Sequence, residues 1–478
     1  MTKSILPSLT TVLAFAALSS GSAFAQGDSG ALLDALVRKN VLTSQEAEDI
    51  RADLVRENAA TTAGKIQLGS SVTEMKLSGD LRLRYQYDNR KSVDTNPDGP
   101  GAGFPQTGQQ RSRERFRLRL NAEFKLGPQF FGGVQLQTGG AADSGNQSFG
   151  TGFGNYDIFI SRAYLGWQPN DWLTVVGGKQ PNPFYTTDLV WDSDINPDGF
   201  TQKIEFHKLF ASRGSESVSY SDGKMISSST SSVRILPPWE LSLVAGQFVF
   251  LDNNENNFDN DSSTDAWLFV TQLQGSYKFN NDLKLTVAPG YMAYTASDLS
   301  GVTNETSFNA LGGTRNLSII TAPGDFSFKV AGLKTKVLWD LAYNVDGNGR
   351  AQEIYRMTGL NGVSGHSNRD NLAWLAGVQV GENKKQGDWS IFANYRQTGF
   401  AAVDPNLNDS DFALGKVNTQ GFKVGMAYNL TNFAVLAATY FDATSLRKNL
   451  YGGEATGGNK LADLSSIRIF QLDLNVKF

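Results

Sequence analysis

The chain of 478 residues contains no cysteine. A disulfide framework, a thiolate metal site and a thiol nucleophile are therefore excluded. Charged residues make up only 19% of the sequence, and the formal net charge is −4. Because proteins that bind nucleic acid usually carry a basic excess, we expect no nucleic-acid partner.

Long hydrophobic runs are also missing beyond the first residues. Leu6 to Leu18 is apolar, and Ala23 to Ala25 forms an A-x-A cleavage site, so residues 1–25 are predicted to be a signal peptide. After residue 25 no apolar run approaches the roughly 18 residues that a membrane helix needs. A chain of this kind can cross a membrane only as a closed barrel.

Residues that could support catalysis are scarce. The two histidines, His207 and His366, have no partner at helical spacing for a metal pair, and no nucleophile-elbow motif is present. We therefore predict no enzyme activity and no cofactor. The Asp/Asn-dense run 252–265 has the alternate spacing of a calcium loop, but lacks its glycine and its final glutamate. A hydrated surface loop is the simpler interpretation.

Alternating strands are what the sequence does contain, and the clearest one ends the chain. In residues 466–478, apolar side chains from Phe470 to Phe478 alternate with a mostly polar set. This period of two predicts a strand with one apolar face. The pattern resembles the closing strand of Gram-negative outer-membrane proteins, whose final phenylalanine is part of the signal for barrel assembly. That resemblance implies outer-membrane lipid and the barrel-assembly machinery as partners of the C-terminal strand.

Similar strands recur along the chain, and the connections between them alternate between short and long. The predicted fold is all-β, a transmembrane antiparallel barrel of about 16 strands, with 14 or 18 remaining open. Residues 226–236 are taken as the sixth strand, mainly because the turn at Pro237-Pro238 needs a strand before it. Short turns are expected in the periplasm and long loops outside the cell.

A segment of different character precedes the barrel. Residues 26–65 show helical spacing of apolar residues, and Thr43 with Glu46 fits a capping box. We predict a short periplasmic helical hairpin here and a barrel over residues 66–478. The sequence leaves three roles open for the helical hairpin: a simple appendage, a coiled-coil seam between protomers, or a tether to another envelope component.

The segment 177–200 is too long and too aromatic for an ordinary surface loop. It has apolar side chains to bury and a run of carboxylates to expose to water, so we expect the part at about 180–200 to fold inward and narrow a pore. The predicted constriction residues are Lys179, Pro181, Phe184, Tyr185, Asp188, Trp191, Asp192, Asp194 and Asp198. An extracellular lid is the alternative.

The opposing wall is predicted to be basic. The arginines alternate with apolar residues on the first strands, and an arginine at mid-depth facing lipid costs roughly 2–4 kcal/mol, so they are expected to face the lumen. The predicted pore-lining set is Arg82, Arg84, Arg115, Arg117, Arg119 and Arg162. These arginines could instead pair with acids of the wall and only support the barrel.

Two stretches together carry a family resemblance. LLDALVRKNVLTSQEAEDIRADL after the signal segment and GKQPNPFYTTDLVWDSDINPDG at the expected constriction resemble the "putative porin" family of Gram-negative bacteria. The resemblance implies an outer-membrane barrel for passive diffusion of small hydrophilic solutes, and analogy with sixteen-stranded porins implies a homotrimer. The basic wall is similar to that of anion-selective porins, but no lysine cluster for a phosphate site is visible in the sequence.

The predicted function is thus a water-filled porin. An anion- or phosphate-selective porin, and a plugged barrel acting as an adhesin or receptor, are the alternatives. A soluble secreted all-β binding protein would need the apolar face to be a core.

Overall fold

The structure is a computed structural model that describes residues 36–39, 43, 45–48, 50, 69–92, 108–217, 230–252, 266–295, 314, 316–358, 370–447 and 464–478. The chain divides into two units, residues 1–69 and 70–478. The predicted signal segment, His366 and residues 253–265 of the Asp/Asn-dense run lie outside the described residues, so they stay predictions.

In the first unit the described residues include a capping box. The Thr43 backbone N–H donates to a Glu46 carboxylate oxygen at 2.8 Å, and the Glu46 backbone N–H donates to Thr43 Oγ at 3.2 Å. The reciprocal bonds satisfy two N–H groups that would otherwise be unpaired at the start of the helical turn 45–48. Among the described residues no helix is long and apolar enough to cross a bilayer.

Strands are the main secondary structure of the second unit. They are β1 (Val72–Ser92), β2 (Gln109–Leu126), β3 (Phe130–Thr138), β4 (Gln147–Ser148), β5 (Ile158–Asn170), β6 (Leu173–Lys179), β7 (Asp198–Glu205), β8 (Ser212–Ser217), β9 (Thr230–Ile235), β10 (Trp239–Leu251), β11 (Ala266–Asn280), β12 (Leu283–Val287), β13 (Gly290–Tyr294), β14 (Ser318–Thr321), β15 (Gly324–Val330), β16 (Leu333–Asn344), β17 (Leu372–Gly381), β18 (Trp389–Thr398), β19 (Thr419–Asn429), β20 (Ala434–Ser445) and β21 (Leu464–Lys477). The described helical segments of this unit are α3 (Phe206–Leu209), α4 (Gly347–Thr358) and the single 3-10 turn η4 (Ala413–Gly415).

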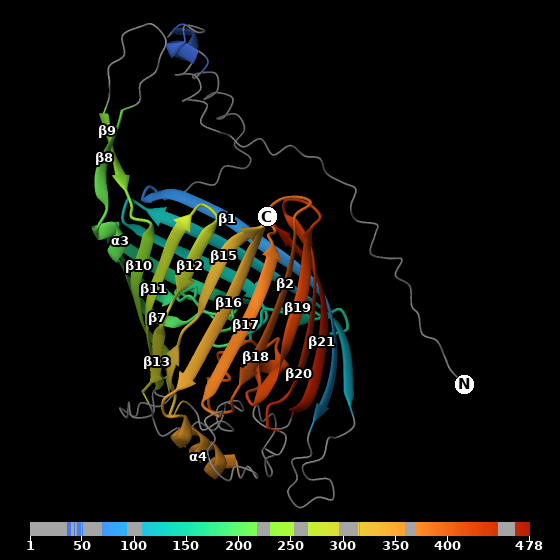
Figure 1. The fold of residues 1–478 in the computed structure, drawn as a ribbon. Coiled ribbons are helices and arrows are strands. Elements are labelled where there is room, and N and C mark those ends of the chain that lie inside the picture. The colour runs from blue at the N-terminus through green and yellow to red at the C-terminus, as the bar shows by residue number, and fades with distance from the viewer. Residues whose placement is uncertain are drawn as a thin grey trace, which may run out of the picture. The chain divides into compact units, whose positions relative to one another are not determined.

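The strands form one closed antiparallel barrel (Figure 1). Each barrel strand pairs with the barrel strands before and after it in the chain, with β8 and β9 outside the barrel sheet, and β1 pairs with β2 on one side and with β21 on the other. β12 and β13 form one interrupted strand, β14 and β15 form another, and β4 is a two-residue addition beside β2. The barrel therefore has sixteen strands, as the sequence predicts.

Side chains alternate between the two faces of this wall. On the outer face Leu83 is 45% exposed and Met426 is 57% exposed, whereas the neighbouring Arg84 on the inner face is 5% exposed. This arrangement inverts that of a water-soluble protein, because large apolar side chains lie outside and charged ones inside. It is the pattern expected of a barrel surrounded by lipid.

The connections differ at the two ends of the barrel. Short turns lie at the end that holds the C-terminus, and α4 lies at the opposite end (Figure 1). One predicted strand is wrong: the sixth strand of the barrel is β7, and residues 230–235 form β9, which pairs only with β8 in a separate hairpin. β7 escaped prediction because Phe200 and Ile204 are its only large apolar side chains. The connection from β7 to β10 is consequently long.

Two neighbouring strands are interrupted at the same level of the wall. The break between β12 and β13 contains Pro289, and the break between β14 and β15 contains Pro323. Proline lacks the N–H that a ladder needs, so it cannot continue regular pairing. The carbonyl groups stay bonded, since Ala288 N–H donates to Pro323 O and Leu273 N–H donates to Pro289 O, both at 2.9 Å.

The barrel closes on its last residue. Gly79 N–H donates to Phe478 O at 2.7 Å, and Phe478 N–H donates to Gly79 O at 3.0 Å. A Cβ atom at residue 79 would lie 2.6 Å from the Phe478 ring and 2.7 Å from Arg119 O. Only glycine therefore fits beneath the terminal ring.

We expect Gly79→Val to destabilise the barrel by about 1–3 kcal/mol, the usual cost of overpacking, because the side chain would displace the ring from the seam. Urea unfolding of the refolded protein measures this change. Gly275→Val is the matched control, since the nearest atom to a Cβ there lies at 3.6 Å. Equal stability of the two variants would contradict the role of the terminal ring.

Candidate functional site

A segment between β6 and β7, residues 180–197, leaves the wall and folds into the barrel. Its two ends meet at a glycine pair, because Gly178 lies opposite Gly199 in the register of β6 and β7. Their φ angles are 110° and 150°. A Cβ atom would lie 2.4 Å from Ala163 O at residue 178 and 2.1 Å from Gln247 O at residue 199. The departure point of the segment thus depends on glycine at both positions.

The apolar side of this segment packs against one wall of the barrel. Phe184, Leu189, Val190, Trp191 and Ile195 form a buried cluster with inward-facing residues of the wall, among them Val244, Phe248, Leu268, Val270 and Met292. Polar bonds fix its position as well. The side-chain amide of Gln272 accepts from Tyr185 N–H and donates to Tyr185 O, both at 2.8 Å. Tyr185 also donates its hydroxyl hydrogen to Asp325.

A second segment, residues 399–418, also folds inward and packs on the first. Ser410 N–H donates to Asp192 Oδ2 at 3.0 Å, and Asp409 N–H donates to Asp188 O at 3.2 Å. Residues 401–416 are one of the long connections predicted from the sequence, and this contact was not predicted. The buried run of small and apolar residues from Phe400 to Val403, followed by an acidic run, was the available signal.

Two cations, the buried Arg396 and the partly buried Lys423, hold the inward segments to the wall. Lys423 Nζ lies 2.5 Å from Asp188 Oδ2 and 3.7 Å from Asp409 Oδ2. Arg396 lies 3.5 Å from Asp409 Oδ2 and donates to Asp188 O at 2.8 Å. Since Asp188 and Asp409 belong to different inward segments, both cations bridge the two.

The carboxylates of the inward segments differ in protonation. Burial raises the pKa of Asp192 to about 7, against the bonds it accepts from Ser410 and Asp194. Burial likewise raises the pKa of Asp409 to about 6, although Lys423 opposes the shift. For Asp411, burial is outweighed by Arg84 and Arg82, which lower its pKa. The site therefore holds carboxyl groups that titrate near neutral pH beside one that stays ionised.

The predicted arginines lie on the opposite wall, and three of them are ion-paired. Arg84 binds Asp473 at 2.7 Å and Asp411 at 3.0 Å. Arg117 and Arg119 share two acids: Asp80 on the wall, at 3.0 and 3.1 Å, and Asp194 on the first inward segment, at 3.2 and 3.4 Å. Wall acids and segment acids thus both pair with the arginines.

The other three predicted arginines have neutral partners. Arg82 donates to Asn146 at 2.6 Å, Arg115 to Gln86 at 3.3 Å, and Arg162 to Asn196 at 2.8 Å. Within the described part of the chain, none of the three lies within ion-pair distance of a carboxylate. Their positive charge is therefore not cancelled by direct pairing.

Between wall and segments a polar cavity of about 320 Å³ remains. It is lined by Arg82, Arg117, Arg119, Asp143, Ser144, Asn146, Asp188, Asp192, Ser193, Asp194, Asp409, Ser410, Asp411 and Lys423. Basic side chains come mainly from the wall and acidic ones from the inward segments. In the described residues no cluster of three metal-ligating side chains is present.

Two predicted residues lie elsewhere. Asp198 begins β7 rather than belonging to the inward segment, and it pairs with Lys179 at 2.9 Å. Neither lines the polar cavity. Pro181 lies in the segment, and Trp191 is buried there, with its indole N–H donating to Ile195 O at 3.1 Å.

A closed sixteen-stranded barrel with an apolar outer face and inward-folded segments defines the porin class of outer-membrane proteins. The sequence profile of the family described as "Putative porin" matches residues 14–362 and 325–478. The chain therefore belongs to this family, as its motifs predict, and its place is the Gram-negative outer membrane.

Solved structures of porins resemble it at low identity. A Salmonella typhi OmpF complex with daunomycin is 10% identical with a TM-score of 0.45, covering 86% of this chain and 100% of that one. A triple mutant of the Rh. blastica porin is 10% identical with a TM-score of 0.39, covering 85% and 100%. No curated protein matches the sequence.

We expect Lys423→Met to destabilise the protein by about 1–3 kcal/mol, because it leaves the buried Asp409 and the partly exposed Asp188 beside one remaining cation. Urea unfolding again gives the measure. Lys125→Met is the control, since the Lys125–Glu74 pair is 60% exposed at both ends and such pairs contribute at most about 1 kcal/mol. If Lys423→Met lowers the free energy of unfolding no more than the control does, the contacts of Lys423 with Asp188 and Asp409 are not needed for stability.

Asp192 should make the stability depend on pH. The pKa of Asp192 is about 7 in the folded protein and about 3.9 in the unfolded chain. Its contribution to the free energy of unfolding is therefore fully present below about pH 4 and lost as pH rises through 7. Asparagine does not titrate, so in Asp192→Asn the pH dependence that Asp192 causes should vanish. The substitution should otherwise change the free energy of unfolding by an amount that is the same at every pH. The stability difference between variant and wild type, measured from pH 4 to 8, should therefore drift in favour of the variant. A difference that stays constant would refute the titration.

Proposed function

We propose that the protein is a porin for passive diffusion of small hydrophilic solutes and ions through a water-filled lumen. The inward segment 180–197 is the constriction, and the arginine wall is its opposite side. Filtering is by size and by charge, as expected of a polar lining at close range. Neither catalysis nor a cofactor is part of this proposal.

One observation carries the proposal: the inward segment is two-sided. Its apolar residues pack on the wall around Phe248, while Asp188, Asp192 and Asp194 face the polar cavity. A plug built only to stabilise the barrel would have no need of a charged cavity, because burying charge is costly unless each charge is paired. A solute passage does need one.

Charges of opposite sign across the cavity produce a transverse field. Arg82 contributes to it most directly, because it lines the cavity and its hydrogen-bond partner among the described residues is the neutral Asn146. A monovalent ion about 5 Å from one unit charge interacts with it by about 0.8 kcal/mol even in water. The field is thus strong enough to discriminate between ions.

The membrane setting completes the proposal. The short turns, the connection from β7 to β10 and the N-terminal residues 26–65 lie in the periplasm, and the other long connections face the outside. The C-terminal strand with Phe478 is read by the barrel-assembly machinery, and outer-membrane lipid surrounds the apolar face. A homotrimer is proposed by analogy with sixteen-stranded porins alone.

A plugged barrel acting as an adhesin or receptor is the second candidate. Residues 399–418 favour it, because this segment fills further space inside the barrel beside the first. The polar cavity of about 320 Å³ argues for a remaining passage. Conductance in a planar bilayer separates the two, since an adhesin inserts without discrete current steps.

We expect Arg82→Gln to shift the ratio of cation to anion permeability by about threefold to fivefold in favour of cations, given the field of one lost charge. Asp194→Asn should shift the ratio in the opposite direction. The reversal potential under a salt gradient measures both.

Arg468→Gln is the control, because Arg468 is 65% exposed and pairs with Asp442 on the wall. It should leave the reversal potential unchanged. If Arg82→Gln behaves like this control, the constriction lies elsewhere. A correctly folded wild type that inserts without conducting would refute the porin proposal.

A further inference from the structure

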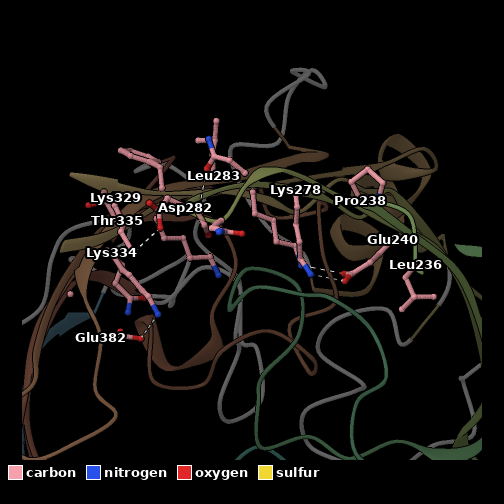
Figure 2. A pocket seen from close by; sticks show the side chains of 18 of the residues that line it. Leu236, Pro238, Glu240, Lys278, Asp282, Leu283, Lys329, Lys334, Thr335 and Glu382 are labelled. Atoms are coloured by element: carbon pink, nitrogen blue, oxygen red, sulfur yellow. Dashed lines mark hydrogen bonds and ion pairs between the residues drawn. The ribbon is translucent and has the colours of Figure 1, made fainter. Parts of the chain in front are cut away.

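Five lysines gather at the barrel end that holds the short turns. They are Lys278, Lys284, Lys329, Lys334 and Lys336, and they line a cavity of about 850 Å³ together with three carboxylates, Glu240, Asp282 and Glu382. Figure 2 shows Lys278 directed at Glu240 and Lys334 directed at Glu382. The lining of this cavity therefore carries an excess of positive charge.

The strand register brings these lysines together. Lys278 of β11 lies opposite Lys284 of β12, which lies opposite Ser327 of β15, which in turn lies opposite Lys336 of β16. Neighbouring strands are about 4.8 Å apart, so this row spans about 15 Å across the wall. No sequence pattern reveals it, because the residues are up to 58 positions apart.

The row faces the lumen. Its lysines alternate with Tyr277 and Val337, which are 42% and 41% exposed on the outer face. In the same cavity lies the buried His207. The lysines are thus at the mouth of the proposed passage and away from lipid.

Two lysine pairs lie directly opposite each other in the register, Lys278 with Lys284 and Lys329 with Lys334. Like charges in directly opposed positions destabilise a sheet. A structural role alone does not call for such repeated pairs. Their presence points to a use for concentrated positive charge.

The lysines differ in how tightly they are held. Lys329 Nζ is 2.6 Å from Asp282 and Lys334 Nζ is 2.9 Å from Glu382, the normal range for such bonds. In contrast Lys278 and Lys284 share Glu240 at 3.3 Å each.

Lys336 is held most loosely, since its Nζ lies 3.6 Å from Asp325. That carboxylate already accepts hydrogen bonds from Tyr185 and Ser327. Each lysine ammonium has three N–H donors. Among the described residues, the row Lys278, Lys284 and Lys336 therefore has N–H donors beyond those in its long contacts, and its side chains are 37–57% exposed.

We propose that this row is a binding site for small multivalent oxyanions at the periplasmic mouth of the barrel. Phosphate and polycarboxylates share the required chemistry, because each presents several acceptor oxygens to separate ammonium groups. A monovalent ion such as chloride is too small to contact all three ammonium groups of the row at once. The inference rests on the proposed porin function, because anions that cross the proposed pore would bind at this site on their way.

The test uses the full-length protein in planar bilayers with a chloride background of low ionic strength, where screening is weak. Phosphate and citrate are titrated separately into the chamber facing the short turns. We expect saturable reduction of the chloride current by at least one of them. The anion with the lower half-blocking concentration identifies which source of oxyanion the site prefers.

In the variant with Lys284→Gln and Lys336→Gln, the half-blocking concentration should rise at least about tenfold, as expected from the loss of charge-assisted hydrogen bonds. The variant with arginine at both positions keeps the charge and should still be blocked. Lys125→Gln is the control, because Lys125 lies in a different pocket and pairs with Glu74.

Equal block in wild type and in the glutamine variant would overturn the site, as would the same loss in the Lys125→Gln control. A protein that never conducts refutes the porin proposal. In that case the binding of phosphate and citrate to the protein in detergent, measured by calorimetry, tests the oxyanion site independently. Binding of phosphate or citrate that is lost in the glutamine variant would support it. Absence of binding for both anions would refute it.

Discussion

The fold depends on the requirement that no backbone N–H or C=O group meets lipid without a partner. A sheet satisfies this requirement only when its first and last strands pair, because an open edge leaves a row of unsatisfied groups. β1 supplies that pairing over most of its length, from Asp80 opposite Lys477 to Ser92 opposite Leu464. Once the wall is closed, every second side chain must face a lumen, and the contents of that lumen become the functional question.

The lumen is filled unevenly. Both inward segments pack on the wall formed by β10 to β17, at apolar residues such as Phe248 and Met292. The second segment also packs through Phe412 on β20 and β21. The arginine wall of β1 and β2 stays opposite a polar cavity. One part of the barrel wall thus packs against the inward segments through apolar side chains, and another part carries charged side chains toward the polar cavity.

The sequence predicted the barrel well because alternation, turn length and the closing strand are local signals. Arg117 and Asp194 could also be placed on facing surfaces, since an arginine cannot face lipid and a two-sided segment must bury one side. Features set by register were not predictable. The lysine row, the role of Lys423 as a bridge between Asp188 and Asp409, and the weakly amphipathic β7 all depend on which strands become neighbours.

The bridges between the inward segments join residues far apart in the chain. Asp188 meets Lys423 across 235 positions, and Asp192 meets Ser410 across 218. Contacts of such long separation form late in folding, because the intervening chain must first be ordered. Segment 180–197 cannot acquire its final neighbours until β18 and β19 exist. The inward segment 180–197 therefore reaches its final arrangement only when the last third of the chain is in place.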